Sequence, residues 1–126
     1  MKKTIYTKSA PNPVGPYCQA TVVNGFLYCS GQIGINPQTN SLVEGIENQS
    51  EQVMKNIKAL LDEADYNFSD VVKTTCFLSD MNNFSKFNDI YAKHFVSNPA
   101  RSCVEAKLPK GALVEVEIIA HKESEA

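Results

Sequence analysis

The chain has 126 residues, of which 43% are hydrophobic and 21% are charged, and its formal net charge is −2. This length suits one domain over residues 1–126 that can bury a core of its own, and the composition excludes an intrinsically disordered chain. The small negative charge, with basic residues scattered rather than striped, argues against nucleic acid as a partner.

Two further classes of protein are excluded by local sequence features. Neither the apolar run of a signal peptide nor a stretch of membrane-spanning length is present, so we expect a cytoplasmic protein with no membrane partner. The cysteines form no Cys-x-x-Cys pair, which argues against structural zinc and favours reduced, mostly buried thiols. They are Cys18, Cys29, Cys76 and Cys103.

The first third of the chain is predicted to form strands. A short strand over Thr4–Thr7 is followed by a proline-rich loop, and a second strand runs over Tyr17–Val23. Asn24-Gly25 then precedes the apolar run Phe26–Cys29. This dipeptide is typical of a type I′ turn, which needs positive φ at both central residues, so we expect an antiparallel hairpin.

Glycines follow at the end of this hairpin, in Ser30-Gly31-Gln32-Ile33-Gly34. They fit either a β-bulge without a function or a place where a ligand approaches bare backbone, and the sequence leaves both open. The cluster Asn36–Asn40 is predicted to be a turn.

A helix and a buried strand come next. Apolar residues recur at helical spacing from Asn48 to Ala64. Asn48 and Glu51 resemble a capping box, which places the helix start within a residue or two of Asn48. The β-branched run Val71–Leu78 predicts a strand, and the order strand, helix, strand predicts parallel flanking strands if both lie in one sheet.

A second helix is predicted to begin between Asp80 and Asn83 and to run to Phe95, with aromatic residues that fit the core most simply. Asn98-Pro99 ends it, because the residue before a proline is pushed out of the α region. Two strands follow, joined by a loop around Leu108–Gly111. Two helices cover only one face of about six strands, so the other face must be polar or be buried against a partner.

The last two strands carry most of the candidate chemistry. Because strand side chains alternate, Arg101, Cys103 and Glu105 share one face of the first strand. Glu115 and Glu117 share one face of the second. A guanidinium, a thiol and carboxylates could thus converge on one wall of a site. The alternative is that Arg101 forms an exposed ion pair and the glutamates line a solvated face.

Several motifs follow one another in the order found in a known family. They are Gly-Pro-Tyr at 15–17, Ser-Gly-Gln-Ile at 30–33, Asp-Val-Val-Lys-Thr at 70–74, Phe-Leu-Ser-Asp-Met at 77–81, Phe84 with Phe87-Asn88 and Tyr91, Pro-Ala-Arg-Ser-Cys-Val at 99–104, and Leu-Pro-Lys-Gly-Ala-Leu-Val-Glu-Val-Glu at 108–117. On these motifs the chain resembles the RidA/YjgF family of enamine and imine deaminases over nearly its whole length.

The resemblance implies a fold, an assembly and an activity. The fold is a single α+β domain, chorismate mutase-like, with two helices packed on one face of a mixed sheet of about six strands. The assembly is a homotrimer with active sites in the clefts between subunits. The activity is that of a hydrolase acting on C=N, which deaminates 2-iminobutanoate, 2-iminopropanoate and related enamines to 2-oxo acids and ammonia without a cofactor or a metal.

Site residues are carried over position by position. In the family's scheme Arg101 anchors the substrate carboxylate through paired hydrogen bonds. Glu115 holds or activates the attacking water, with Glu117 as the second choice. The substrate-binding positions that match are Tyr17, Ser30, Gly31, Asn88 and Cys103. Without the resemblance, Tyr17 fits a strand start and Asn88 an exposed helix position.

The chain departs from the family pattern in two places. Three residues separate Val104 from Leu108 where the family usually has four, which bears on where Glu115 lies relative to Arg101. Asp65 stands at the end of the first helix, where glycine is usual. The tail from Lys122 to Ala126 is expected to fray.

Two other functions remain open at this stage. The same Arg101 cleft could capture small carboxylates as a ligand sensor. RNA cleavage with inhibition of translation, or a chaperone-like holdase activity, is also attributed to members of the family. The acidic balance and the lack of an aromatic and basic platform argue against RNA.

Overall fold

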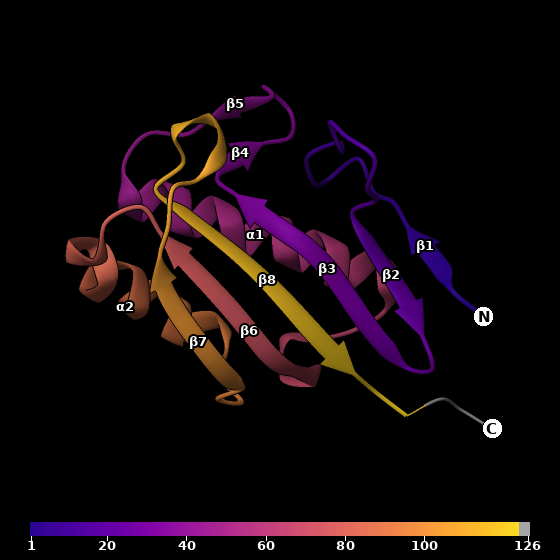
Figure 1. The fold of residues 1–126 in the computed structure, drawn as a ribbon. Coiled ribbons are helices and arrows are strands. Elements are labelled where there is room, and N and C mark those ends of the chain that lie inside the picture. The colour runs from indigo at the N-terminus through magenta and orange to yellow at the C-terminus, as the bar shows by residue number, and fades with distance from the viewer. Residues whose placement is uncertain (124–126) are drawn as a thin grey trace.

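The computed structural model describes residues 1–123, in which six strands form one mixed sheet with two α-helices packed on one of its faces (Figure 1). The strands lie in the order β1-β2-β3-β8-β6-β7, and all neighbours are antiparallel except β6 and β7, which are parallel. The expected α+β architecture is therefore confirmed. The bounds are β1 Lys3–Ile5, β2 Ala20–Val23, β3 Phe26–Ile33, α1 Ile46–Ala64, β6 Val71–Leu78, α2 Phe84–His94, β7 Ala100–Glu105 and β8 Val114–His121.

Short elements complete the chain. Strands β4 (Ile35–Asn36) and β5 (Ser41–Leu42) form a small hairpin around the predicted turn, which the sequence did not predict as strands. Single 3₁₀ turns cover Phe68–Asp70, Met81–Asn83 and Pro109–Gly111. Neither helix of the described chain is long and apolar enough to cross a membrane.

Two pairs of strands in the sheet run parallel, and each pair is connected through a helix. Helix α2 connects β6 to β7, which are parallel neighbours. Helix α1 lies between β3 and β6 in the sequence, and these strands are also parallel because both pair antiparallel with β8 between them. The parallel crossover predicted from the sequence is confirmed. The last strand thus occupies the middle of the sheet rather than an edge.

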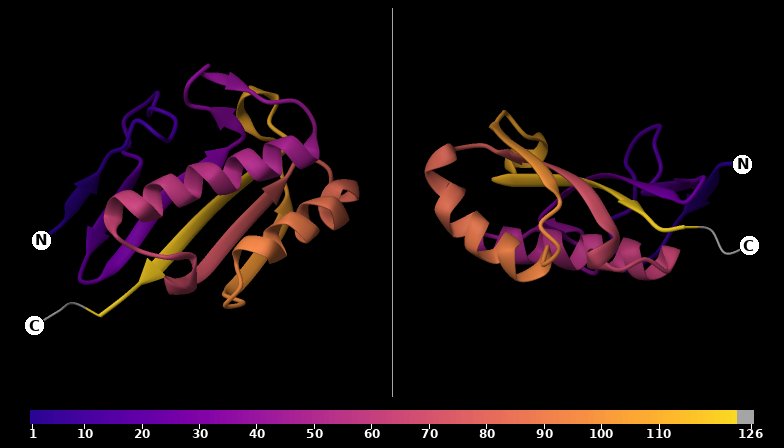
Figure 2. Two further views of the ribbon diagram at one scale, coloured as in Figure 1. Left: turned by 180° about the vertical axis from the view of Figure 1, so that it is seen from behind. Right: turned by 90° about the horizontal axis from the view of Figure 1, so that it is seen from below.

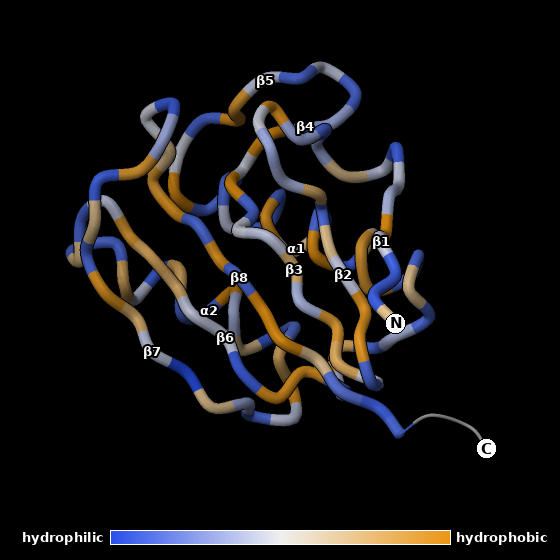
Figure 3. The backbone as a smooth tube through the Cα atoms, turned by 45° about the vertical axis from the view of Figure 1, so that its right-hand side comes forward, coloured by the Kyte–Doolittle hydropathy of each residue, from blue (hydrophilic) through white to orange (hydrophobic). Residues whose placement is uncertain are grey.

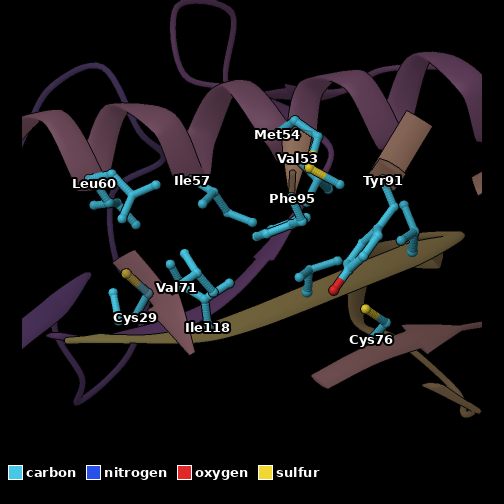
Figure 4. Packing of buried hydrophobic residues seen from close by; sticks show 14 of the residues in the cluster. Cys29, Val53, Met54, Ile57, Leu60, Val71, Cys76, Tyr91, Phe95 and Ile118 are labelled. Atoms are coloured by element: carbon cyan, nitrogen blue, oxygen red, sulfur yellow. The ribbon is translucent and has the colours of Figure 1, made fainter. Parts of the chain in front are cut away.

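The core lies between the sheet and the two helices, which pack side by side (Figure 2). Figure 4 shows Ile57 and Leu60 of α1 facing Val71 and Ile118 of the sheet, with Phe95 and Tyr91 beside them. Burial of these side chains supplies most of the drive for folding, since a buried aliphatic or aromatic side chain contributes about 1.5–3 kcal/mol. Of the predicted inward aromatics of the second helix, Phe87, Tyr91 and Phe95 are confirmed as core, and Phe84 is only partly buried.

The opposite face of the sheet, here called the open face, carries no helix. Along β3, β6 and β8 more buried and more exposed positions mostly alternate, and the tube in Figure 3 changes between orange and blue along β8. On β8 the buried positions Val114 and Val116 point to the helices, and Glu115 and Glu117 point to the open face. Large apolar side chains are also left exposed there, at Phe26, Tyr28 and Val104.

The first hairpin is the predicted one, with positive φ at both turn residues, 52° at Asn24 and 80° at Gly25. Its first strand is shorter than predicted and begins at Ala20 rather than Tyr17. The reason is the buried side chain of Gln19, whose amide nitrogen donates to the carbonyls of Thr7, Ala10 and Pro11 at 2.9–3.2 Å. These bonds fold the proline-rich loop onto this segment and keep it irregular.

Two predictions need correction, one about the start of α1 and one about the C-terminal tail. Helix α1 begins within two residues of Asn48, but its cap is Gly45, and the Asn48 amide donates to the Glu44 carbonyl at 3.1 Å from inside the first turn. The expected fraying does not begin at Lys122, whose backbone N–H donates to the Gly25 carbonyl at 3.1 Å. The rest of that prediction, for residues 124–126, lies outside the described residues.

Candidate active site

Arg101 lies at the edge strand β7 and points to the helix face of the sheet. Its guanidinium carbon lies over the Tyr91 ring, 4.6 Å from the centroid, and 5.5 Å from the centroid of Phe84. Its Nη1 donates to Asn88 Oδ1 at 2.7 Å. The ion pairs of residues 1–123 do not include Arg101. The guanidinium is thus half-buried and fixed in place, with donors left for an anion.

Helix α2 supplies the three side chains that hold this arginine. Phe84, Asn88 and Tyr91 are spaced four and three residues apart, so they project from one side of the helix. The 3₁₀ turn before α2 is held by Glu105, whose Oε1 accepts from the Met81 N–H at 2.9 Å. A hollow of about 450 Å³ lies beside the guanidinium, lined by Asn88, Tyr91, Ala92, Phe95, Asn98, Pro99 and Arg101.

Cys103 shares the helix face with Arg101, two residues further along β7. It is in register with Cys76 of β6, which is fully buried. Burial raises the pKa of the Cys103 thiol, and the nearby Arg101 charge only partly offsets this. The thiol therefore stays neutral near pH 7, which suits packing and not nucleophilic attack.

Glu115 lies on the open face against the bare backbone of Gly31. Gly31 falls in the irregular part of β3 between Cys29 and Gln32, where the register with β8 shifts. A Cβ at Gly31 would lie 2.0 Å from Glu115 Oε2, so the carboxylate occupies the space that a side chain would fill. Burial, and secondly the charge of Glu117, raise the pKa of Glu115. The bulge predicted for this glycine is present, and a functional carboxylate candidate lies on it.

Tyr17 lies near Gly31, at the rim of a second hollow. This hollow has a volume of about 100 Å³ and is lined by Pro11, Asn12, Val14, Tyr17, Gly31, Gln32, Ile33, Ile35, Asn40, Pro109 and Lys110. The Tyr17 ring is half exposed, and its hydroxyl oxygen accepts from the Val14 N–H at 3.4 Å. It remains able to donate its proton to a ligand.

Ser30, which the sequence predicts as a substrate-binding residue, is hydrogen-bonded to the backbone through two of its groups. Its hydroxyl donates to the Cys18 carbonyl at 2.7 Å, and its N–H donates to the Gln19 carbonyl at 2.9 Å. The proton that would bind a substrate is therefore engaged with the backbone. These two hydrogen bonds hold the segment that follows Tyr17 against β3, one residue before Gly31.

The candidate residues form two groups on opposite faces of the sheet. Arg101 pairs in register with Thr74, and Thr74 pairs with Ile118, which is buried under the helices. Glu115 is three positions from Ile118 along β8 and so points the other way. The hypothesis that the guanidinium and the carboxylates converge on one wall is wrong for a single chain. The strands of Arg101 and Glu115 are not even neighbours, because β6 lies between them.

Sequence reasoning missed the aromatic surroundings of Arg101. Phe84 and Tyr91 were assigned to the core, and Tyr91 is indeed buried, but both rings face the guanidinium. The signal was present in their spacing of seven residues, with Asn88 between them. Within residues 1–123, no three His, Cys, Asp or Glu side chains come together as ligands for a metal ion.

Comparisons with known proteins show which family and which solved structures the chain is similar to. Residues 7–122 match the family model described as endoribonuclease L-PSP. A RutC family protein of Pyrococcus horikoshii is 50% identical, over 98% of this chain and 100% of the relative. The crystal structure of the Rid-family protein YyfA from Yersinia pestis is 54% identical with a TM-score of 0.94, covering 97% of this chain and 100% of that one.

A further crystal structure, of Escherichia coli TdcF, was solved with bound serine. It is 34% identical to this chain with a TM-score of 0.91, and the match covers 96% of this chain and 99% of TdcF. Serine carries a carboxylate beside a nitrogen-bearing carbon.

Proposed function

Because the chain belongs to the endoribonuclease L-PSP family, also known as the YjgF/RidA family, we propose that it hydrolyses 2-imino acids to 2-oxo acids and ammonia. The proposed substrates are 2-iminobutanoate and 2-iminopropanoate, with their enamine tautomers. No metal or cofactor takes part in this scheme. The protein would be a deaminase in amino-acid metabolism that removes reactive imines.

One observation carries the proposal, the fixed guanidinium of Arg101. Among residues 1–123 it has no carboxylate partner, it is half-buried, and two aromatic rings and Asn88 restrict its movement. A guanidinium in this state binds a carboxylate through two parallel hydrogen bonds at little further cost in side-chain entropy. A small organic acid is the ligand class that such a group favours.

The chemistry then needs a positioned water and a base. Water adds to the imine carbon and forms a tetrahedral carbinolamine, whose C–N bond breaks to release ammonia and leave the C=O of the 2-oxo acid. Glu115 is the proposed base, which takes one proton from the attacking water and then the hydroxyl proton of the carbinolamine, and passes each to the nitrogen, so that both protons leave with the ammonia. Its raised pKa makes it a stronger base than an ordinary surface glutamate. Tyr17 would donate to the bound carboxylate from the rim.

We also propose that the two groups meet between copies of the chain. Arg101 and Glu115 point away from opposite faces of one sheet, so one copy does not offer both to a single small substrate. The exposed apolar residues of the open face give a neighbouring copy a surface to bury. A homotrimer, with Arg101 from one subunit and Glu115 from the next, completes three sites by one cyclic symmetry.

The test is stopped-flow measurement of 2-iminobutanoate, generated in situ by a threonine dehydratase. We expect the protein to accelerate loss of the imine in proportion to its concentration. Binding of 2-oxobutanoate without acceleration would instead identify a carboxylate sensor. Single-stranded RNA serves as a second substrate, because the family description names RNA cleavage, and we expect no cleavage from a chain of net charge −2.

A further inference from the structure

Beneath Arg101 lies a buried pair of hydroxyl groups that the proposed reaction does not use. Tyr91 reaches from α2 toward the sheet (Figure 4), and its hydroxyl lies 2.8 Å from Oγ1 of Thr74. Thr74 is fully buried and Tyr91 is 7% exposed. Thr74 Oγ1 also accepts a weaker hydrogen bond from the Cys76 thiol at 4.0 Å, so each hydroxyl is the main hydrogen-bond partner of the other in this buried place.

This pair is joined to Arg101 through both the sheet and the ring. Thr74 and Arg101 are direct register partners on β6 and β7. The Tyr91 ring, whose hydroxyl is held by Thr74, lies under the guanidinium at 4.6 Å. Thr74 therefore contacts Arg101 in two ways: strand pairing holds the Arg101 backbone, and the Tyr91 ring that Thr74 holds lies against the guanidinium.

The contacts on the guanidinium restrict different motions. Asn88 binds one edge at Nη1, which fixes rotation within the guanidinium plane. The Tyr91 ring centroid lies 4.6 Å from the guanidinium carbon, which restricts movement of the group toward that ring. The aromatic contact uses none of the guanidinium N–H groups as a hydrogen-bond donor to a side-chain oxygen, so the donors not bound to Asn88 stay available for a carboxylate. A tilt would misalign both hydrogen bonds to a bidentate ligand.

We propose that Tyr91 is a positioning residue for Arg101, locked by Thr74, and that this pair sets how tightly the site binds the carboxylate of its substrate. The inference rests on the proposed role of Arg101 as the carboxylate anchor. In this role Tyr91 acts through Arg101, and Thr74 acts through Tyr91. Their effect should therefore appear in binding of the carboxylate, in KM and in the Kd of 2-oxobutanoate, and leave kcat nearly unchanged.

The first test compares three single variants and one double variant of the pair with the wild type. Loss of the ring in Tyr91→Leu should raise KM and the Kd of 2-oxobutanoate about tenfold, with kcat within about twofold. Tyr91→Phe keeps the ring and should restore both constants to within about threefold of the wild type. Thr74→Val removes the same hydrogen bond, so the double variant with Tyr91→Phe should be no weaker in binding than the weaker single variant.

Tyr66→Leu is the matched control. Tyr66 is also buried, its hydroxyl donates to the Gly25 carbonyl at 2.8 Å, and Lys122 Nζ lies 5.0 Å from its ring centroid. This variant therefore loses a ring, a hydrogen bond and a cation contact beside the turn between β2 and β3, which β8 and β6 separate from β7. We expect a similar loss of thermal stability and an unchanged Kd for 2-oxobutanoate.

The outcomes separate this inference from the proposed function. An unchanged Kd in Tyr91→Leu, or an equal rise in Tyr66→Leu, overturns the positioning role. If Tyr91→Leu does not fold, a Kd equal to that of the wild type in the double variant Thr74→Val with Tyr91→Phe overturns the part assigned to Thr74. A wild type that binds 2-oxobutanoate in a Tyr91-dependent way but does not accelerate imine loss supports the inference and contradicts the deaminase function.

Discussion

Arg101 and Glu115 point away from opposite faces of the same sheet, although only fourteen positions separate them in the sequence. Their strands, β7 and β8, are not neighbours, because β6 lies between them in the sheet. Arg101 is in line with Ile118 through Thr74, and Glu115 is an odd number of positions from Ile118 along β8, so the two side chains point to opposite faces. A reaction that needs both groups on one small substrate therefore needs two copies of the chain.

Mixing two inactive variants tests this directly. Arg101→Ala lacks the anchor and Glu115→Gln lacks the base, so each alone should lose nearly all imine hydrolysis. Co-expressed in equal amounts, they should regain about one quarter of the wild-type kcat/KM, because a random cleft has both wild-type groups with a probability of one in four. Each variant alone serves as the control. A mixture as inactive as its components would show that one chain supplies both groups.

The fold followed from the sequence more closely than the site did. The type I′ hairpin at Asn24-Gly25 and the strand Val71–Leu78 were placed correctly, because turn chemistry and β-branched runs are local signals. The cap of α1 was misplaced because Asn48 bonds backward to Glu44 within the first turn. Local patterns identified which residues share a strand face and did not show how distant strands are ordered.

The site could be named by family resemblance but not assembled from the sequence. Strand alternation put Arg101 with Cys103 and Glu115 with Glu117, and both groupings hold. Whether the two groups share a face depends on the register of β6 with each neighbour, including the shift between Val71 and Lys73, and no local pattern encodes this. The position of Ser30, with its hydroxyl bonded to a backbone carbonyl, was hidden for the same reason.

The shape of the guanidinium, beyond its charge, should matter for binding. Arg101→Lys keeps the positive charge but loses the planar fork, so KM for 2-iminobutanoate should rise by about 10–100-fold. Steady-state kinetics provide the measurement. Full activity in Arg101→Lys would remove the bidentate anchor from the mechanism.

Cys103→Ala should stay within about threefold of wild-type kcat/KM in the same steady-state measurement, because burial raises the pKa of this thiol and keeps it neutral.

Alanine substitutions at two glycines with nearly equal φ should distinguish the cost of a steric clash from the cost of backbone strain. Gly25 has φ 80° and Gly45 has φ 85°. A Cβ at Gly25 would lie 2.5 Å from the Lys122 carbonyl oxygen, whereas at Gly45 it would meet nothing within 4 Å. Chemical denaturation should show that Gly45→Ala costs about 1 kcal/mol of unfolding free energy and that Gly25→Ala costs about 1–3 kcal/mol more. Equal losses would mean that the turn moves freely away from Lys122.

Gly31→Ala should impair activity while leaving the fold in place. The added methyl would lie 2.0 Å from Glu115 Oε2, and the end of a flexible side chain is what must move. We expect kcat to fall about 10–100-fold because the base is displaced. The melting temperature should change by no more than a few degrees. Gly45→Ala is the control, since a Cβ there would meet no atom within 4 Å and would displace no side chain. Wild-type kcat in Gly31→Ala would argue against Glu115 as the base.

The pH dependence of the reaction should respond to Glu117. The proposed base acts in its ionised form, so activity should rise as pH increases through the pKa of Glu115. Burial raises that pKa first, and the negative charge of Glu117 raises it further by making a second negative charge nearby less favourable. Glu117→Gln removes this charge and should lower the pKa of Glu115, which moves the acid limb of the kcat/KM profile to lower pH.

Glu63→Gln makes the same change in net charge on the exposed side of α1 and should leave the profile in place. Protonation of the imine itself also depends on pH, but it contributes equally to the wild type and both variants and cancels in the comparison. An acid limb that moves to higher pH in Glu117→Gln, or that moves equally in the two variants, would mean that a group other than Glu115 governs the limb. The direction of the shift therefore identifies the base without requiring an inactive variant.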